Sequence, residues 1–197
     1  MNLFNYHPRA SRRVNIGSRP LGADCPLRLQ SMTTCATTDT EGCVRQAEAI
    51  IRAGADYVRL TTQGTREAEN LREIRDELRR RGYDTPLVAD VHFNPRVAET
   101  AAAIVEKVRI NPGNYIDPAR TFKQLTYTDE EYAAELHRLE ERFGRLLDIC
   151  REHGTALRIG VNHGSLSDRI MCRYGDTPEG IVESCMEFLR VCVRERL

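Results

Sequence analysis

The sequence predicts an α/β protein in which parallel β-strands alternate with α-helices. Short apolar segments recur along the chain, each is followed by a stretch with helical periodicity, and capping residues or glycines separate the two. The 197 residues, 41% hydrophobic and 29% charged, suit an ordinary folded domain. They hold about five strand–helix units, whereas a closed (β/α)8 barrel typically needs about 250 residues. The pattern therefore allows an open doubly wound sheet or an incomplete barrel.

The predicted strands follow an amino-terminal hairpin, in which Gly17 and Pro20 interrupt the short apolar stretches of residues 13–21. The segments expected as strands are residues 27–32, 55–60, 86–91, 105–110 and 156–161. They are apolar without a strict alternation of polar and apolar positions. This pattern is typical of a parallel sheet covered by helices.

The predicted helices begin at residues that cap helix amino termini. The expected starts are the capping box Thr38-Asp39-Thr40-Glu41, then Thr65, Asn94-Pro95, a second capping box Thr128-Asp129-Glu130-Glu131, and Thr177-Pro178. Gly54 and Gly82 are expected to end the first two helices, because glycine readily adopts the left-handed conformation found at helix carboxyl termini.

Charge and composition argue against several partners. Lys+Arg and Asp+Glu both number 29, so no overall basic charge favours nucleic acid or an anionic membrane surface. No apolar run reaches the roughly 18 residues that span a bilayer, and residues 1–8 lack the apolar region of a signal peptide. Seven cysteines without a Cys-x-x-Cys pair favour reduced thiols. We therefore expect a cytoplasmic protein that binds neither nucleic acid nor membrane.

Polar residues gather where the predicted strands end. They are Arg59, Asp90, His92, Arg109, Asn111, Arg158 and Asn162. Spacings of two or four residues put the members of each set on one side of their strand, while Val108, Ile110 and Ile159 take the other side. The carboxyl ends of parallel strands and the loops after them form the ligand site of α/β proteins. We expect these polar side chains to line one pocket.

The three arginines of this set predict an anion site. Converging guanidinium groups repel one another unless an anion lies among them, and their paired N–H donors match phosphate oxygens, so a diphosphate is the expected ligand. Gly113, Gly164 and Ser165 are expected to add backbone or hydroxyl donors. The alternative is that each arginine pairs with a glutamate on a covering helix. Such pairing is plausible for a single arginine but less expected for three arginines at matching positions in three strand–helix units.

Asp90 and His92 have a less specific pattern, because two such residues on one side of a strand suit a metal pair, an acid–base pair or a structural hydrogen bond. No third metal ligand is evident, so contact with the bound ligand is favoured and no metal site is predicted. Four cysteines fall on apolar helix faces and are expected in the core: Cys43, Cys150, Cys185 and Cys192. No role is assigned to Cys25, Cys35 or Cys172.

Five segments resemble, in order, the barrel motifs of the 4-hydroxy-3-methylbut-2-enyl diphosphate synthase family. They are residues 29–33, 54–59, 87–93, 108–114 and 157–166, with the sequences LQSMT, GADYVR, LVADVHF, VRINPGN and LRIGVNHGSL. The resemblance spans about residues 13 to 185 and implies an incomplete TIM (β/α)8-type barrel. Residues 1–197 are then expected to be the amino-terminal part of the substrate-binding barrel, without its last strands and without the iron–sulfur domain.

The resemblance implies the reductive ring opening of 2-C-methyl-D-erythritol 2,4-cyclodiphosphate in isoprenoid biosynthesis, with electrons from ferredoxin or flavodoxin passing through a 4Fe-4S cluster. The family's anion contacts match Arg59, His92, Arg109 and Arg158, with Asp90, Asn111 and Asn162 as polar neighbours. The cluster belongs to the carboxyl-terminal domain, so this chain alone is expected to bind none and to be inactive. Residues 115–143 look longer than in the short bacterial form, which implies the version with an additional domain.

Two other interpretations remain open. One is a dihydropteroate synthase-like barrel, which pterin binding would select, and the other is a non-catalytic interaction fragment, which would bind no small anion. The first and fifth strands would be open edges of an incomplete barrel, and such edges are templates for pairing with another chain, so a homo-oligomer is expected. The sequence does not indicate which of the two electron donors is used.

Overall fold

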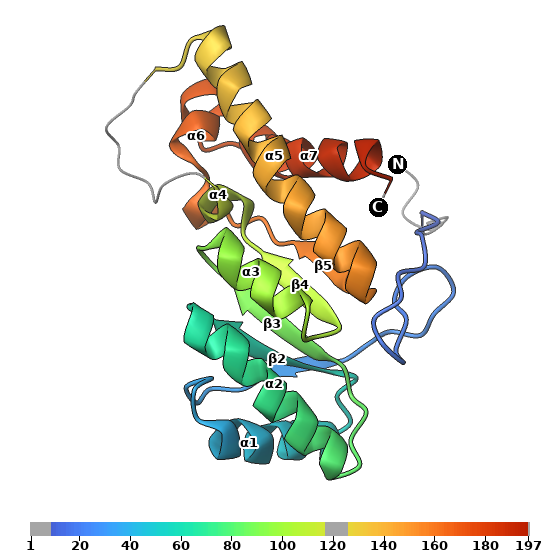
Figure 1. The fold of residues 1–197 in the computed structure, drawn as a ribbon. Coiled ribbons are helices and arrows are strands. Elements are labelled where there is room, and N and C mark those ends of the chain that lie inside the picture. Colours follow the sequence, from blue (N-terminus) through green and yellow to red (C-terminus); the bar gives the residue numbers. More distant parts are fainter. Residues whose placement is uncertain (1–8, 117–125, 197) are drawn as a thin grey trace.

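A computed structural model describes residues 9–116 and 126–196 of the chain. The elements, shown in Figure 1, are in chain order β1 (Gln30–Met32), α1 (Thr40–Arg52), β2 (Tyr57–Thr62), α2 (Thr65–Arg80), β3 (Leu87–Val91), α3 (Pro95–Ala102), β4 (Lys107–Ile110), α4 (Pro112–Tyr115), α5 (Asp129–His153), β5 (Ala156–Ile159), the 3-10 turn η1 (His163–Ser165), α6 (Asp168–Tyr174) and α7 (Pro178–Arg194). Every strand overlaps its predicted segment. The short helices α4 and α6 were not predicted.

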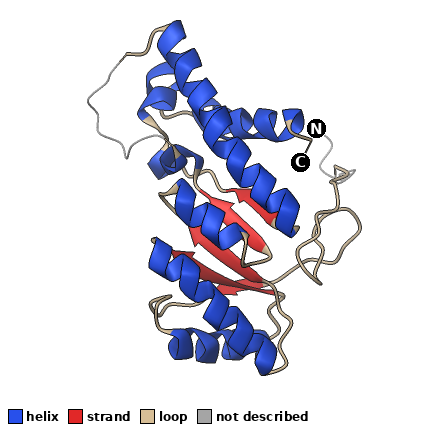
Figure 2. Cartoon of the chain, in the orientation of Figure 1, coloured by secondary structure: helices blue, strands red, loops and turns tan. Residues whose placement is uncertain are grey.

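The five strands form one parallel sheet in the order β1-β2-β3-β4-β5. A doubly wound sheet reverses its strand order at a switch point, whereas a (β/α) barrel places each strand beside its predecessor. Helices α1, α2, α3 and α5 contact one another in succession and lie on one side of the sheet (Figure 1 and Figure 2). The fold is therefore of the barrel type, and in the described part of the chain β1 and β5 are open edges.

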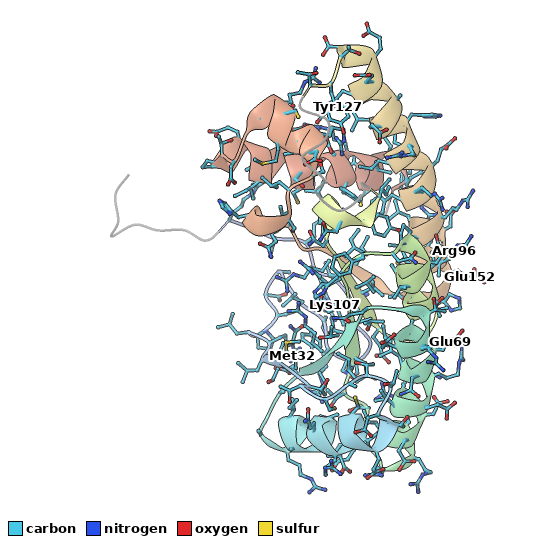
Figure 3. All side chains as sticks on the ribbon, turned by 90° about the vertical axis from the view of Figure 1, so that its left-hand side faces the viewer. Met32, Glu69, Arg96, Lys107, Tyr127 and Glu152 are labelled. Carbon is cyan, nitrogen blue, oxygen red and sulfur yellow. The ribbon has the colours of Figure 1, made fainter. Side chains whose placement is uncertain are left out.

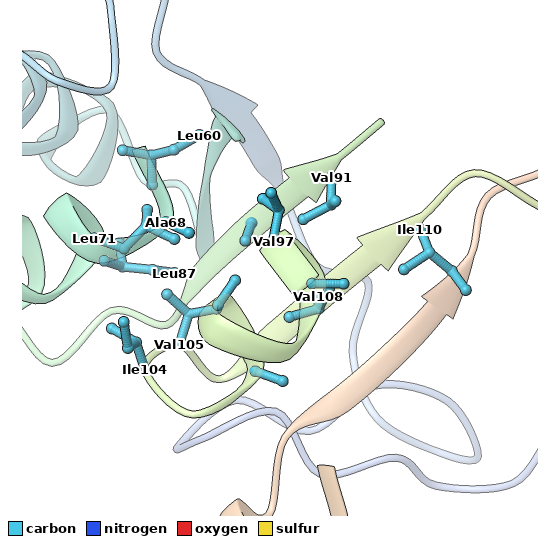
Figure 4. Close-up of a cluster of buried hydrophobic side chains, with 14 of the residues drawn as sticks. Leu60, Ala68, Leu71, Leu87, Val91, Val97, Ile104, Val105, Val108 and Ile110 are labelled. Carbon is cyan, nitrogen blue, oxygen red and sulfur yellow. The ribbon is translucent and has the colours of Figure 1, made fainter. Parts of the chain in front are cut away.

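The main core lies between the sheet and these helices. It contains the alternate residues of β2, β3 and β4 that face the helices, several of which Figure 4 shows: Val58, Leu60, Leu87, Ala89, Val91, Val108 and Ile110. Full burial of such an aliphatic side chain contributes about 1.5 to 3 kcal/mol. The intervening residues of the same strands point to the opposite side, which a closed barrel would enclose and which we call the inner face.

The amino-terminal hairpin covers one end of the inner face. Val14 and Leu21 form an antiparallel bridge, with N–H to O distances of 2.8 and 2.9 Å. Gly17 has a φ of +50° in the turn between them, in the region that favours glycine. Next to it, Ile16 packs in a second buried cluster with Tyr57, Val88 and Ala156. These three residues lie at the amino-terminal ends of their strands, so the carboxyl ends remain the open side of the inner face.

The structure corrects one predicted helix start and confirms another. Asp39, not Thr38, caps α1, and its carboxylate accepts a hydrogen bond from the Gly42 amide at 3.0 Å. The capping box of α5 forms as predicted, with hydrogen bonds in both directions between Thr128 and Glu131. The capping-box patterns therefore locate both helices, but α1 begins one residue later than its pattern indicated.

Helix α7 packs against α5 and α6 around a buried ion pair. The Glu187 carboxylate lies 2.5 Å from the Arg169 guanidinium and accepts a hydrogen bond from the Tyr132 hydroxyl. The side chains of Arg169 and Glu187 are only 3% and 1% exposed. This polar contact therefore joins three helices inside otherwise apolar packing.

Other predictions concern the cysteines and the polar segment. Cys43 and Cys150 are buried, as expected, while Cys185 and Cys192 are half-buried. Residues 115–143, expected to be longer than in the short form of the family, lie partly outside the described residues. Within the described ranges, no helix is both long enough and apolar enough to cross a membrane.

Candidate functional site

Charged side chains from four neighbouring strands share the inner face: cations from β2, β4 and β5 and a carboxylate from β3. In the strand register, Asp90 lies beside Arg109, and Arg109 lies beside Arg158. Arg59 and Lys107 lie one row nearer the amino-terminal ends, on either side of β3. Because residues in one row of a parallel sheet project from the same face, the two rows form one polar surface.

Asp90 connects the predicted site residues. One carboxylate oxygen lies 3.0 Å from Arg109 Nη1, and the other accepts a hydrogen bond from Arg59 and lies 3.2 Å from His92 Nε2. The Asp90 side chain is 2% exposed. The alternative in which arginines pair with helix glutamates is therefore wrong for Arg59 and Arg109, because both pair with this strand carboxylate.

Arg109 is fixed by two acceptors. Besides Asp90, its Nη2 donates to the carbonyl oxygen of Gly160 at 2.6 Å. A Cβ atom at position 160 would lie 2.1 Å from Arg109 Nε, so the guanidinium needs glycine at this position in the loop after β5. Burial lowers the pKa of Arg109 and the neighbouring Asp90 opposes that shift, as expected for a guanidinium held in a partly dry pocket beside a carboxylate.

Arg158 differs from the other two arginines. It is exposed, and among the described residues no hydrogen bond or ion pair involves its side chain. It lies next to Arg109 in the register, and its charge contributes to lowering the pKa of that arginine. Two of the three predicted arginines thus share a carboxylate, while the third stands beside them with its donors exposed.

Lys107 is a fourth cation on this surface, and the sequence reasoning missed it. Figure 3 shows Lys107 on the side of the sheet away from Glu69, Arg96 and Glu152, which project from the outer helices. Lys107 is 8% exposed. The spacing between Lys107 and Arg109 could have revealed it, because a residue two positions before Arg109 lies on the same side of β4.

The three remaining predicted residues form a second group in the loops. Asn111 Nδ2 donates to Ser165 Oγ at 2.8 Å, while the Asn162 side chain accepts from the Gly164 amide at 3.0 Å. A Cβ atom at Gly113 would lie 1.5 Å from the Ser165 carbonyl oxygen, so the loops after β4 and β5 touch through their backbones. These side chains hold the two loops together, and among the described residues no hydrogen bond joins them to the arginines.

Comparison with known proteins identifies the family. The model of the GcpE TIM-barrel domain matches residues 11–197. The chain belongs to this family.

Two relatives that match nearly the whole chain are 4-hydroxy-3-methylbut-2-en-1-yl diphosphate synthases by name. The chain is 68% identical to "4-hydroxy-3-methylbut-2-en-1-yl diphosphate synthase (flavodoxin)" from Phocaeicola vulgatus, over 99% of this chain and 32% of that protein. It is 47% identical to "4-hydroxy-3-methylbut-2-en-1-yl diphosphate synthase (ferredoxin), chloroplastic" from Oryza sativa subsp. japonica, over 97% of this chain and 26% of that protein. The chain thus spans about a third or less of the length of these relatives.

A solved dihydropteroate synthase from Stenotrophomonas maltophilia also superposes on the GcpE domain. Its TM-score is 0.44 and its sequence identity 15%, over 93% of this chain and 89% of that chain. Similarity at this level does not identify a function.

Two hollows lie near the ends of the GcpE domain's first strands and helices. One, of about 500 Å³, is lined by residues 32–37 after β1 and by Thr61, Gln63 and Glu67. Thr61 lies beside Asp90 in the register, so this hollow adjoins the cationic surface. The other, of about 620 Å³, lies between α1 and α2 among charged side chains on the outer face, away from the predicted residues. Only the first therefore extends the candidate site.

Proposed function

We propose that this domain binds the cyclic diphosphate substrate of a 4-hydroxy-3-methylbut-2-en-1-yl diphosphate synthase. The whole protein would open the ring of 2-C-methyl-D-erythritol 2,4-cyclodiphosphate reductively in isoprenoid biosynthesis. The observation that carries the proposal is the inner-face surface, where Asp90 contacts Arg59 and Arg109 and the further cations Lys107 and Arg158 lie on the same face. Since one carboxylate cannot neutralise four cations, this surface favours an anion of more than one charge.

We propose different tasks for the predicted residues, which their contacts support. Asp90 and the Gly160 carbonyl fix the direction of the Arg109 guanidinium before any ligand arrives, and Asp90 also orients the ring of His92. A guanidinium held in place loses less conformational entropy when it binds a phosphoryl group. Arg158 supplies donors that no described residue occupies. In this proposal the chain positions the diphosphate at the carboxyl ends of β2 to β5.

The 4Fe-4S cluster implied for the whole protein does not fit the side chains described here. Such a cluster needs several thiolates close together. Residues 9–116 and 126–196 contain no group of three or more His, Cys, Asp or Glu side chains arranged to hold a metal. We therefore propose that cluster ligands come from another part of the whole protein, and no step of the reaction is derived through the cluster.

The proposed electron donor is flavodoxin or ferredoxin, since each appears in the name of a relative. The free cysteines of the described residues suit the reducing conditions of the cytoplasm, which we propose as the location. Oxidation of either reduced donor by the full natural protein, measured with and without the cyclic diphosphate, tests the assignment. Substrate-dependent oxidation of one donor supports it, and oxidation of neither contradicts it.

Binding of the cyclic diphosphate to the full natural protein, measured by calorimetry, tests the site. Arg109→Ala and Arg158→Ala should each weaken binding by about 1.5 to 3 kcal/mol, the range for hydrogen bonds between charged groups. Arg96→Ala is the matched control, because Arg96 is exposed on the outer helix α3 and should leave the affinity unchanged. If both inner-face variants bind as tightly as the wild type, the pocket assignment is wrong.

A further inference from the structure

Lys107 is a buried cation without a counter-ion in the described part of the chain. It is 8% exposed, and no hydrogen bond or ion pair of the described residues involves its ammonium group. Its Nζ lies over an aromatic ring, 5.4 Å from the centre of the Tyr57 ring. A buried ammonium group is costly unless it is paired, so the position calls for an explanation.

The surroundings of Lys107 make the position more costly. Burial, followed by the charges of Arg158 and Arg59, lowers the pKa of Lys107. In the described part of the chain, the carboxylate on this face is that of Asp90, which already contacts Arg59, Arg109 and His92. Tyr57, the remaining group that faces Lys107, supplies only the face of its ring. No described neighbour therefore compensates the positive charge.

We propose that Lys107 binds a phosphoryl oxygen of the same diphosphate, as a cation of the deeper row of the site. This inference rests on the proposed function and adds a binding residue to it. Lys107 and Arg59 lie at the same level on either side of β3, one row deeper than Arg109 and Arg158. A lysine carries its charge on a flexible four-carbon stem, so its ammonium group can reach an anion held by the row above.

Proton uptake is a consequence of this arrangement. A group whose pKa is lowered by burial and by neighbouring cations regains affinity for its proton when an anion binds beside it. The affinity for the anion should therefore fall as the pH rises through the lowered pKa of Lys107 towards the ordinary lysine value. Arg109, whose guanidinium remains charged throughout this range, cannot cause such a change.

The test compares Lys107→Met and Lys107→Arg in the full natural protein, with inorganic pyrophosphate as the probe. Lys107→Met should bind pyrophosphate about 10- to 100-fold more weakly than the wild type. Lys107→Arg should restore most of the affinity. It should also remove the fall in affinity that the wild type shows as the pH rises towards the ordinary lysine pKa, because arginine keeps its charge. Pyrophosphate titrates equally in both experiments, so the difference between the two proteins reports on Lys107.

A carboxylate elsewhere in the natural protein is the alternative partner of Lys107. In that case Lys107→Met would lower the melting temperature without ligand and leave the pyrophosphate affinity unchanged, which would overturn the proposal. Arg109→Met separates this failure from failure of the proposed function. If Arg109→Met weakens binding and Lys107→Met does not, only the role of Lys107 is wrong. If neither variant weakens binding, the anion site itself is wrong.

Discussion

Replacing Asp90 by asparagine should destabilise the ligand-free protein and make it more responsive to anions. The carboxylate is 2% exposed and pairs with Arg109, whose side chain is 9% exposed, and with Arg59, at 23%. Removing one partner of a buried ion pair costs about 3 to 5 kcal/mol, because the other charge stays buried. Asparagine keeps a carbonyl acceptor and Arg59 is partly hydrated, so we expect a loss near the lower limit, about 3 kcal/mol.

Urea unfolding of the full natural protein, with and without pyrophosphate, measures both effects. Saturating a site to 100 times its Kd stabilises a protein by about 2.7 kcal/mol. Because Asp90→Asn leaves one more uncompensated positive charge, pyrophosphate should stabilise this variant more than the wild type. The control is Asp76→Asn, because the Asp76 side chain is 57% exposed in its pair with Arg75; a change of at most about 1 kcal/mol and no extra response are expected. Equal destabilisation of the two variants, or an equal response to pyrophosphate, would refute the reasoning.

Three further predictions concern single positions. Gly160→Ala should displace the Arg109 guanidinium, which lies where the new Cβ would be, and should weaken pyrophosphate binding in calorimetry. Gly144→Ala has open space around its Cβ and should stabilise α5 by about 0.5 to 1 kcal/mol, which melting curves measure. Glu187→Gln should cost about 3 to 5 kcal/mol in urea unfolding, and the same change at Glu183, whose arginine partner is half exposed, far less. Burial raises the pKa of Cys43 from 9.0 to about 12, so its alkylation at pH 8.5, followed by mass spectrometry, should be roughly a thousandfold slower than that of an ordinary thiol until the protein unfolds.

The order of the elements could be predicted from the sequence because each carries its own local signal. The capping box at Thr128 and Glu131 forms in the structure because the two side chains bond each other's backbone, which needs no tertiary contact. At the first helix the capping-box spacing pointed to Thr38, but Asp39 is an equally good cap and its side chain is the one that bonds the helix amide. Helix α6 was missed because it has seven residues and one of its buried side chains is Arg169, whose partner Glu187 lies on α7.

The candidate site could be predicted only from the position of residues at strand ends and from their spacing along each strand. These two features predicted one shared face for Arg59, Asp90 and Arg109, and the structure joins them in one cluster. Residue spacing within a strand could not show that Asp90 is the shared partner of Arg59 and Arg109, because that contact depends on the register between three strands. Lys107 was overlooked because a lysine at the start of an apolar strand is usually exposed, whereas here it is buried with its ammonium group over the Tyr57 ring.

The position of Asp90 explains how a cluster of cations can exist before an anion binds. Without a carboxylate, Arg59 and Arg109 would repel each other on a sheet face that is partly shielded from water. With it, both guanidiniums are fixed in direction, and the Gly160 carbonyl holds the second from the side of β5. The single negative charge of Asp90 does not also neutralise Lys107 and Arg158, so the described inner face keeps a net positive charge. Because the hairpin covers the amino-terminal end of the inner face, we propose that an anion approaches these cations from the carboxyl ends of the strands.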